Sequence, residues 1–189
     1  RGLELSTVIG INLWQNFDLL HTPSESVLPH VRSDIQEYLK EGTNNIMRMK
    51  LDYLFSPYKD IYARLDLGLM EEMFGGVGGE VLWRPYNRTW AIGLAAHKVR
   101  QRDYKQKFGF LKQDRGGFKK YETVTGHLEL YKEFPRQGVI AQVMAGKFLA
   151  GDKGATIDVS RRFNTGLRLG FFLTKTDVSA QEFGEGSFD

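Results

Sequence analysis

Ionisable side chains in this sequence recur at every second residue of extended stretches, a spacing that places them on one face of a strand. Together with aromatic rings at the same spacing, such a face would offer a hydrated polymer, for example a polysaccharide, mixed hydrogen-bonding groups and stacking platforms. A structural lattice of ion pairs is the alternative interpretation, because opposite charges on neighbouring strands satisfy one another. The candidate substrate-contacting residues are Tyr62, Arg64, Asp66, Glu80, Arg84, His127, Asp158 and Arg168. The same face is expected to carry Arg48, Lys50, Asp52, Glu129 and Trp14.

Carboxylates are the second group that could do chemistry, because glycoside hydrolysis uses two of them on either side of one bond. Glu71 and Glu72 adjoin a glycine-rich stretch, but adjacent residues of a strand point to opposite faces. Asp66 and Glu80 could approach each other across a hairpin. No catalytic residue is therefore predicted. A carbohydrate-active enzyme using Glu71, Glu72 or Asp66 remains the alternative.

Other chemistries lack the residue patterns that they need. The sequence has no cysteine, and its four histidines are scattered without the spacing of metal ligands, so no metal site is predicted. The glycines at positions 75–79 are not followed by Lys and Ser or Thr, which excludes a phosphate-binding loop and favours a flexible loop or a close backbone approach. The net charge of +3 is spread among mixed charges, so we expect no nucleic-acid partner. We also expect no cofactor.

Strands must position the candidate residues, because apolar and polar residues alternate with period two along most of the chain. In the clearest stretch Ile61, Ala63, Leu65, Leu67 and Leu69 alternate with polar residues and glycine. All five prolines are expected to lie outside the strands, since proline cannot donate to a ladder. The nine predicted strands cover residues 3–14, 47–55, 61–69, 80–84, 90–97, 123–130, 139–146, 155–160 and 167–174.

The connections between these strands alternate in length. Short turns are predicted at residues 56–60, 85–88, 134–138 and 163–166, whereas residues 18–44 and 101–120 form long connections. This alternation is typical of outer-membrane barrels, which have short periplasmic turns and longer external loops. Aromatic residues near the short turns would form an interfacial girdle. These residues are Tyr53, Phe55, Trp83, Tyr86, Trp90, Tyr131 and Phe134.

The pattern predicts an all-β fold, an antiparallel transmembrane outer-membrane β-barrel with its apolar face in contact with outer-membrane lipid. Nine strands are an odd number where an even one is expected, so residues 1–189 are interpreted as part of a single barrel domain. A soluble antiparallel sandwich is the alternative. It would place Leu65, Leu67 and Leu69 beneath a second layer of protein.

One connection is predicted to contain a helix. In the insertion at residues 24–42, Pro29 suits a first helical turn and Gly42 suits a helix stop. Val31, Ile35 and Tyr38 share one face at helical spacing. We expect a short amphipathic helix over the mouth of the barrel or against its rim, with simple packing as the simpler role.

Long strings of this sequence resemble the YjbH/GfcD-type (WbfB-like) family of Gram-negative outer-membrane proteins. They are LPHVRSDIQEYLKEG (residues 28–42), YKDIYARLDLGLMEEMFGGVGGEVLWRPYNRTWAIGL (58–94), VRQRDY (99–104), KFLAGDKGATIDVSRRFNTGLRLGFF (147–172) and EFGEGSFD (182–189). The resemblance implies a much longer protein, of which residues 1–189 are the more C-terminal portion. It implies an outer-membrane barrel, often with a lipoprotein-type N-terminus. It also implies a part in exopolysaccharide or group 4 capsule production, with no established catalytic residue to carry over.

The pattern and the resemblance together lead to one hypothesis for function. The chain would belong to a barrel in the bacterial outer membrane that acts in export or assembly of extracellular polysaccharide or capsule, without bond-making chemistry. Its expected partners are outer-membrane lipid, the polysaccharide and other exopolysaccharide or capsule secretion proteins. A structural barrel that anchors periplasmic or surface domains is a further alternative.

Overall fold

The computed structural model of the chain describes residues 2–17, 29, 31–32, 35–112 and 120–179. These residues form one sheet of nine strands, in which each strand pairs antiparallel with the next along the chain. The all-β class and the nine predicted strands are confirmed. The strands are β1 (Gly2–Ile11), β2 (Asn44–Tyr58), β3 (Ile61–Leu69), β4 (Phe74–Trp83), β5 (Trp90–Gln101), β6 (Glu122–Phe134), β7 (Val139–Lys147), β8 (Lys153–Arg162) and β9 (Arg168–Thr176).

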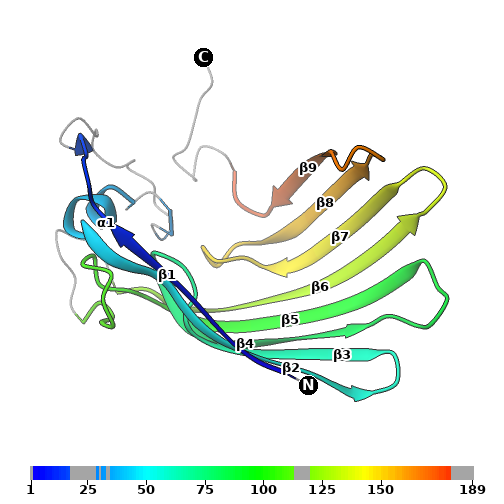
Figure 1. Cartoon of the computed structure of the whole chain (residues 1–189), viewed down its shortest axis with the longest axis horizontal. Helices are drawn as coiled ribbons and strands as arrows, with labels where there is room; N and C mark the ends of the chain where they lie inside the picture. The colour runs from blue at the N-terminus through cyan, green and yellow to red at the C-terminus, as the bar shows by residue number, and fades with distance from the viewer. Residues whose placement is uncertain (1, 18–28, 30, 33–34, 113–119, 180–189) are drawn as a thin grey trace.

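The sheet is curved and open, with β1 and β9 at its two edges (Figure 1). The hairpin turns after β2, β4, β6 and β8 lie at one end of the strands, here called the turn end (Figure 1). The connections after β1, β3, β5 and β7 lie at the opposite end, here called the loop end, and include the helix α1 (Ile35–Glu41). The short turns lie at one end as predicted, but the predicted length difference holds only for the connections after β1 and β5. The connections after β3 (residues 70–73) and β7 (residues 148–152) are as short as the turns.

Two local expectations were wrong. The glycine stretch at residues 75–79 is part of β4, where a Cβ on Gly76 would overlap the carbonyl oxygen of Lys98. Strand backbones approach closely here, so the predicted close approach is correct and the predicted loop is not. Pro57 lies inside β2 at a register shift between Phe55 and Tyr58, a position where a missing donor costs no ladder hydrogen bond.

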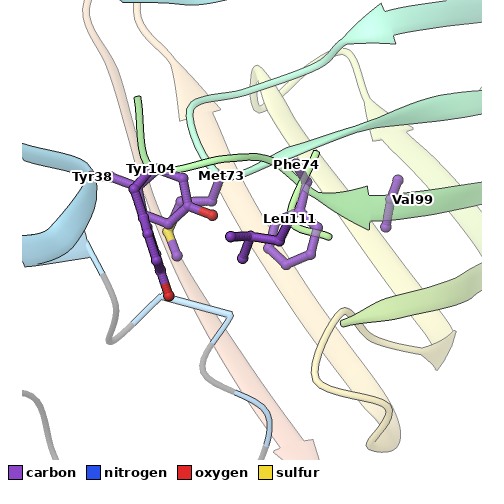
Figure 2. Close-up of a cluster of buried hydrophobic side chains, with 6 residues drawn as sticks. All are labelled: Tyr38, Met73, Phe74, Val99, Tyr104 and Leu111. Atoms are coloured by element: carbon purple, nitrogen blue, oxygen red, sulfur yellow. The ribbon is translucent and has the colours of Figure 1, made fainter. Parts of the chain in front are cut away.

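A buried apolar cluster fills the loop end of the sheet (Figure 2). It consists of Tyr38, Met73, Phe74, Val99, Tyr104 and Leu111, and Val31, Ile35, Met70, Tyr121 and Leu149 pack against it. The rings of Tyr38 and Tyr104 meet edge to face with centroids 4.9 Å apart. The predicted helix is shorter than expected: it covers residues 35–41, and Pro29 and Val31 precede it, so the predicted start was wrong. Its residues Ile35 and Tyr38 pack in this cluster. No described helix has the length and apolar character needed to cross a membrane.

Candidate functional site

Alternate residues of the sheet differ in exposure, and this difference defines two faces. On the face that carries Leu65 and Leu67, here called the outer face, these two side chains are 54% and 56% exposed. On the opposite face, here called the inner face, Asp52 and Asp66 are buried. Side chains converge on the concave side of a curved sheet and spread apart on its convex side, so the inner face is the concave one.

The outer face carries a continuous apolar band. Leu130, Val143, Ile157 and Leu173 are successive register partners across β6 to β9. All of them are exposed, and Leu173 reaches 70%. An apolar surface of this extent is uncommon on a soluble monomer and marks contact with a membrane or another protein. No second layer of described residues covers this band.

Leu69 departs from the expectation made for the same face, since it is only 6% exposed. It lies at the loop end of β3, opposite Gly75. A Cβ on Gly75 would contact the ring of Phe110 at 3.1 Å, so the β5–β6 connection reaches this level. Leu65 and Leu67 are thus free of a covering layer as predicted, whereas Leu69 belongs to the packed loop end.

Arg64 is the centre of an ion network on the inner face. Its guanidinium donates to Glu80 at 2.5 Å and lies 3.8 Å from Asp52 and 3.9 Å from Asp66. Lys50 contacts Asp52 at 3.0 Å. The network joins β2, β3 and β4, and it pairs its two cations with three carboxylates where water is limited.

Gly78 allows a histidine to extend this network across a strand. Asp66, Gly78 and His97 are successive register partners on β3, β4 and β5. A Cβ on Gly78 would overlap the His97 ring, and His97 Nε2 lies 3.3 Å from Asp66 Oδ1. The missing side chain at Gly78 therefore leaves the space through which His97 reaches Asp66. His97 was not among the predicted site residues, although the strand alternation places it on the inner face.

A second polar group lies on β6 and β7. Tyr131 donates its hydroxyl proton to Glu129 and accepts a hydrogen bond from Gln142 at 3.3 Å. His127 lies beside Phe148, with ring centroids 5.0 Å apart. Tyr131 is therefore on the inner face, and its assignment to an interfacial girdle was wrong. Trp83 and Trp90 do form an edge-to-face pair at the turn end, with centroids 5.2 Å apart.

The remaining predicted site residues lie nearer the turn end or along β8. Arg84 forms an exposed ion pair with Glu133 at 3.1 Å. Arg168 donates to the hydroxyl of Ser160 at 2.8 Å. Tyr62 is 53% exposed, and Asp158 pairs in register with Gln142. These residues share the inner side of the sheet but do not converge on one pocket, and contact with a substrate stays a prediction.

The carboxylates considered for hydrolysis do not all lie in one place. Glu71 and Glu72 follow the end of β3, so strand alternation does not apply to them, and both line one groove of about 510 Å³ with Arg32. Glu71 accepts a hydrogen bond from Arg32 at 2.5 Å. Asp66 belongs to the Arg64 network and does not line this groove. Among the described residues no group of three or more His, Asp or Glu side chains could hold a metal ion.

Arg102, which sequence reasoning missed, holds the loop end together. It is 0% exposed and donates to four backbone carbonyls, those of Met47, Glu71, Ile46 and Lys107, at 2.6 to 3.2 Å. The hydroxyl of Tyr38 donates to the carbonyl of Arg102 at 2.6 Å. Burial lowers the pKa of this guanidinium, while Tyr38, Glu72 and Glu71 act in the opposite direction. Its place in the string VRQRDY was the available signal.

Comparison with known proteins now places the chain among its relatives. The model of the YjbH family, described as exopolysaccharide biosynthesis protein YbjH, matches residues 1–189. The chain belongs to the YjbH family. The resemblance seen in its sequence strings is thereby confirmed.

A relative of this YjbH-family chain shows how much of a whole protein it represents. The chain is 37% identical over 181 residues to a protein of Escherichia coli (strain K12) named uncharacterized lipoprotein YjbH. The match covers 94% of the chain and 25% of the relative, so the chain spans about a quarter of that protein's length. No solved structure matches the chain.

Proposed function

We propose that the sheet is part of a transmembrane β-barrel in the bacterial outer membrane and acts in the production or export of extracellular polysaccharide. The observation that carries this proposal is the pair of faces, one apolar and exposed, the other charged and internally paired. Hydrocarbon solvates the apolar outer face, whereas the charged inner face must be kept away from it. The lipoprotein name of the relative and the description of the family support the location and the process.

Strand direction adds a requirement for closing such a barrel. Each strand is antiparallel to its neighbour, so β1 and β9 run in the same direction. Pairing them directly would create a parallel contact in an otherwise antiparallel barrel, and single-chain bacterial barrels have an even number of strands. An odd number of further strands must therefore lie between β9 and β1. The relative is about four times as long as the matched region, which leaves ample chain for them.

The inner face would line the passage or dock a partner of the secretion machinery, without bond-making chemistry. Its ion network presents donors and acceptors close together, as hydroxyl-rich polymers require. Arg64 and Glu80 remain partly exposed, with side chains 34% and 43% accessible, so a polymer could reach them. Tyr62 lies on the same side and offers an exposed ring for stacking against sugars.

Polysaccharide secretion by cells with altered full-length protein tests this function. We expect Arg64→Ala combined with Asp66→Ala to lower secreted polymer per inserted protein, because the inner network loses its central cation. A matched control is Lys98→Ala with Glu122→Ala, which removes an outer-face ion pair at 3.0 Å and one charge of each sign. Unchanged secretion by the inner-face variant, with normal insertion, would contradict a role for this face.

A further inference from the structure

Three lysines form an unusual group on the outer face at the loop end. Lys147 and Lys153 are direct register partners on β7 and β8. Lys175 on β9 pairs with Ala155, which places it diagonally beside Lys153. All three continue the alternation of the apolar residues of their strands, so they lie on the outer face next to Leu173 and Ile157.

This lysine group lacks compensating charge from the described residues. No carboxylate of the described chain lies within ion-pair distance of any of the three ammonium groups. The carboxylate of Asp177 accepts the backbone N–H of Lys153 at 2.8 Å. Like charges placed directly opposite each other in a sheet are destabilising. A ligand of negative charge would remove this penalty.

The position of the group indicates what that ligand is. The apolar band ends at these lysines, and beyond Lys147 and Lys153 lies the short connection at residues 148–152 of the loop end. In a membrane the band contacts hydrocarbon, so the next level outward is that of the lipid headgroups. Lysine suits this level because its stem packs on apolar surface while its ammonium group reaches the polar region.

We propose that Lys147, Lys153 and Lys175 bind the phosphate groups of anionic lipid headgroups at the loop-end boundary of the membrane. This inference rests on the proposed membrane location and deepens it by naming the class of lipid. The proposal assigns lipid binding to the loop-end boundary of the apolar band and not to its turn-end boundary. At the turn end the outer-face Lys132 instead donates to the hydroxyl of Thr89 at 2.9 Å and lies 6.0 Å from the Phe134 ring centroid.

Lipid selectivity of the full-length protein tests the proposal. The protein is reconstituted in phosphatidylcholine vesicles that contain spin-labelled phosphatidic acid or spin-labelled phosphatidylcholine, and the fraction of each label immobilised by the protein is measured. We expect phosphatidic acid to be preferred by a factor on the order of three, because lysines near an anionic surface attract it. The preference should weaken as salt is raised.

Two variants with equal loss of charge decide the outcome. Replacing Lys147, Lys153 and Lys175 by Gln should reduce the preference to near one. Replacing Lys59, Lys132 and Arg136 by Gln, which are exposed at the turn end, should leave it unchanged. A preference retained by the first variant, or lost equally in both, would overturn the proposal while leaving the barrel intact.

Two further results would also overturn the inference, for different reasons. Full suppression of the preference by inorganic phosphate at constant ionic strength would identify a site for free phosphate instead of lipid. Absence of an immobilised component with both labels would mean that the protein does not contact the bilayer, and the proposed function would fail with it.

Discussion

Apolar side chains are buried at the loop end and exposed on the outer face. At the loop end Tyr38, Met73 and Phe74 are at most 2% exposed and pack against a helix and two connections. On the outer face Leu94 and Leu173 are 60% and 70% exposed. The same chain therefore buries apolar residues fully where its connections can cover them.

This contrast indicates that the apolar residues of the outer face differ from core residues, because the described residues leave them without a covering layer. Fully burying a leucine contributes about 1.5–3 kcal/mol, so a long row of exposed ones is costly in water. At the loop end other parts of the chain cover the apolar residues, and the proposed function assigns the same role on the outer face to hydrocarbon. The following predictions test the two regions separately, from the largest expected effect to the smallest.

Arg102→Ala should have the largest effect, because it removes the donor group shared by four buried carbonyls at the loop end. We expect the free energy of unfolding to fall by about 3–5 kcal/mol, since each charged hydrogen bond contributes about 1.5–3 kcal/mol and relaxation recovers part of the loss. Urea unfolding of the full-length protein in detergent measures this. Arg136→Ala, in an exposed turn, is the control and should change stability by less than about 0.5 kcal/mol. A similar change in both variants would remove the special role of Arg102.

Leu128→Arg probes the outer face at the middle of the band. If hydrocarbon surrounds this side chain, the substitution should lower the stability of the bilayer-inserted protein by about 2–4 kcal/mol. Leu169 is the register partner of Arg161 near the turn end, and Leu169→Arg should cost about 0–1 kcal/mol. Equal costs within about 0.5 kcal/mol at both sites are what a water-exposed face would give. Reversible unfolding from vesicles provides the comparison.

Gly78→Ala tests whether the inner face is built around the missing side chain. The new Cβ would overlap the His97 ring and displace it from Asp66, so we expect a loss of about 1–3 kcal/mol in unfolding free energy. Gly126→Ala is the matched control, because its Cβ would meet its nearest neighbour, Ala95 O, at 3.8 Å. That variant should be neutral or more stable by up to about 1 kcal/mol. Loss of stability at Gly126 alone would contradict the packing described for His97.

The smallest effect is expected at the turn end, where Arg84 and Glu133 form an ion pair with side chains 53% and 40% exposed. Exposed pairs contribute about 0.2–1 kcal/mol. A double-mutant cycle with Arg84→Ala and Glu133→Ala should give a coupling energy in this range. A coupling above about 2 kcal/mol would show that this end of the sheet is less accessible to water than its exposure indicates.

The strands could be predicted from sequence because alternation with period two is a local property. The outer-face positions of Leu65 and Leu67 and the inner-face positions of Arg64 and Asp66 follow from that alternation alone. The glycines of β4 were assigned to a loop because glycine has no side chain to show alternation. Their role becomes visible only through the partner strand, where His97 occupies the space above Gly78.

The loop end could not be predicted because its contacts join residues far apart in sequence. Arg102 binds carbonyls at Ile46 and Met47, and Gln106 donates to the carbonyl of Tyr38 at 2.8 Å. The sequence spacing of these pairs matches neither the helix period nor the strand period, so it predicts no contact. Ile35 and Tyr38 lie on the helix that their spacing predicted, whereas Val31 precedes it, and the partners of the helix in the cluster were not predicted.

Site-directed spin labelling along β6 tests the central claim most directly. Labels are placed one at a time at residues 124–131 of the full-length protein in bilayers, and collisions with oxygen, which concentrates in hydrocarbon, are compared with those of a water-soluble nickel chelate. The proposed barrel predicts oxygen maxima at Val124, Leu128 and Leu130 and oxygen minima at Thr125, His127 and Glu129. Nickel access as high at Leu128 as in water, or low access to both reagents there, would contradict it.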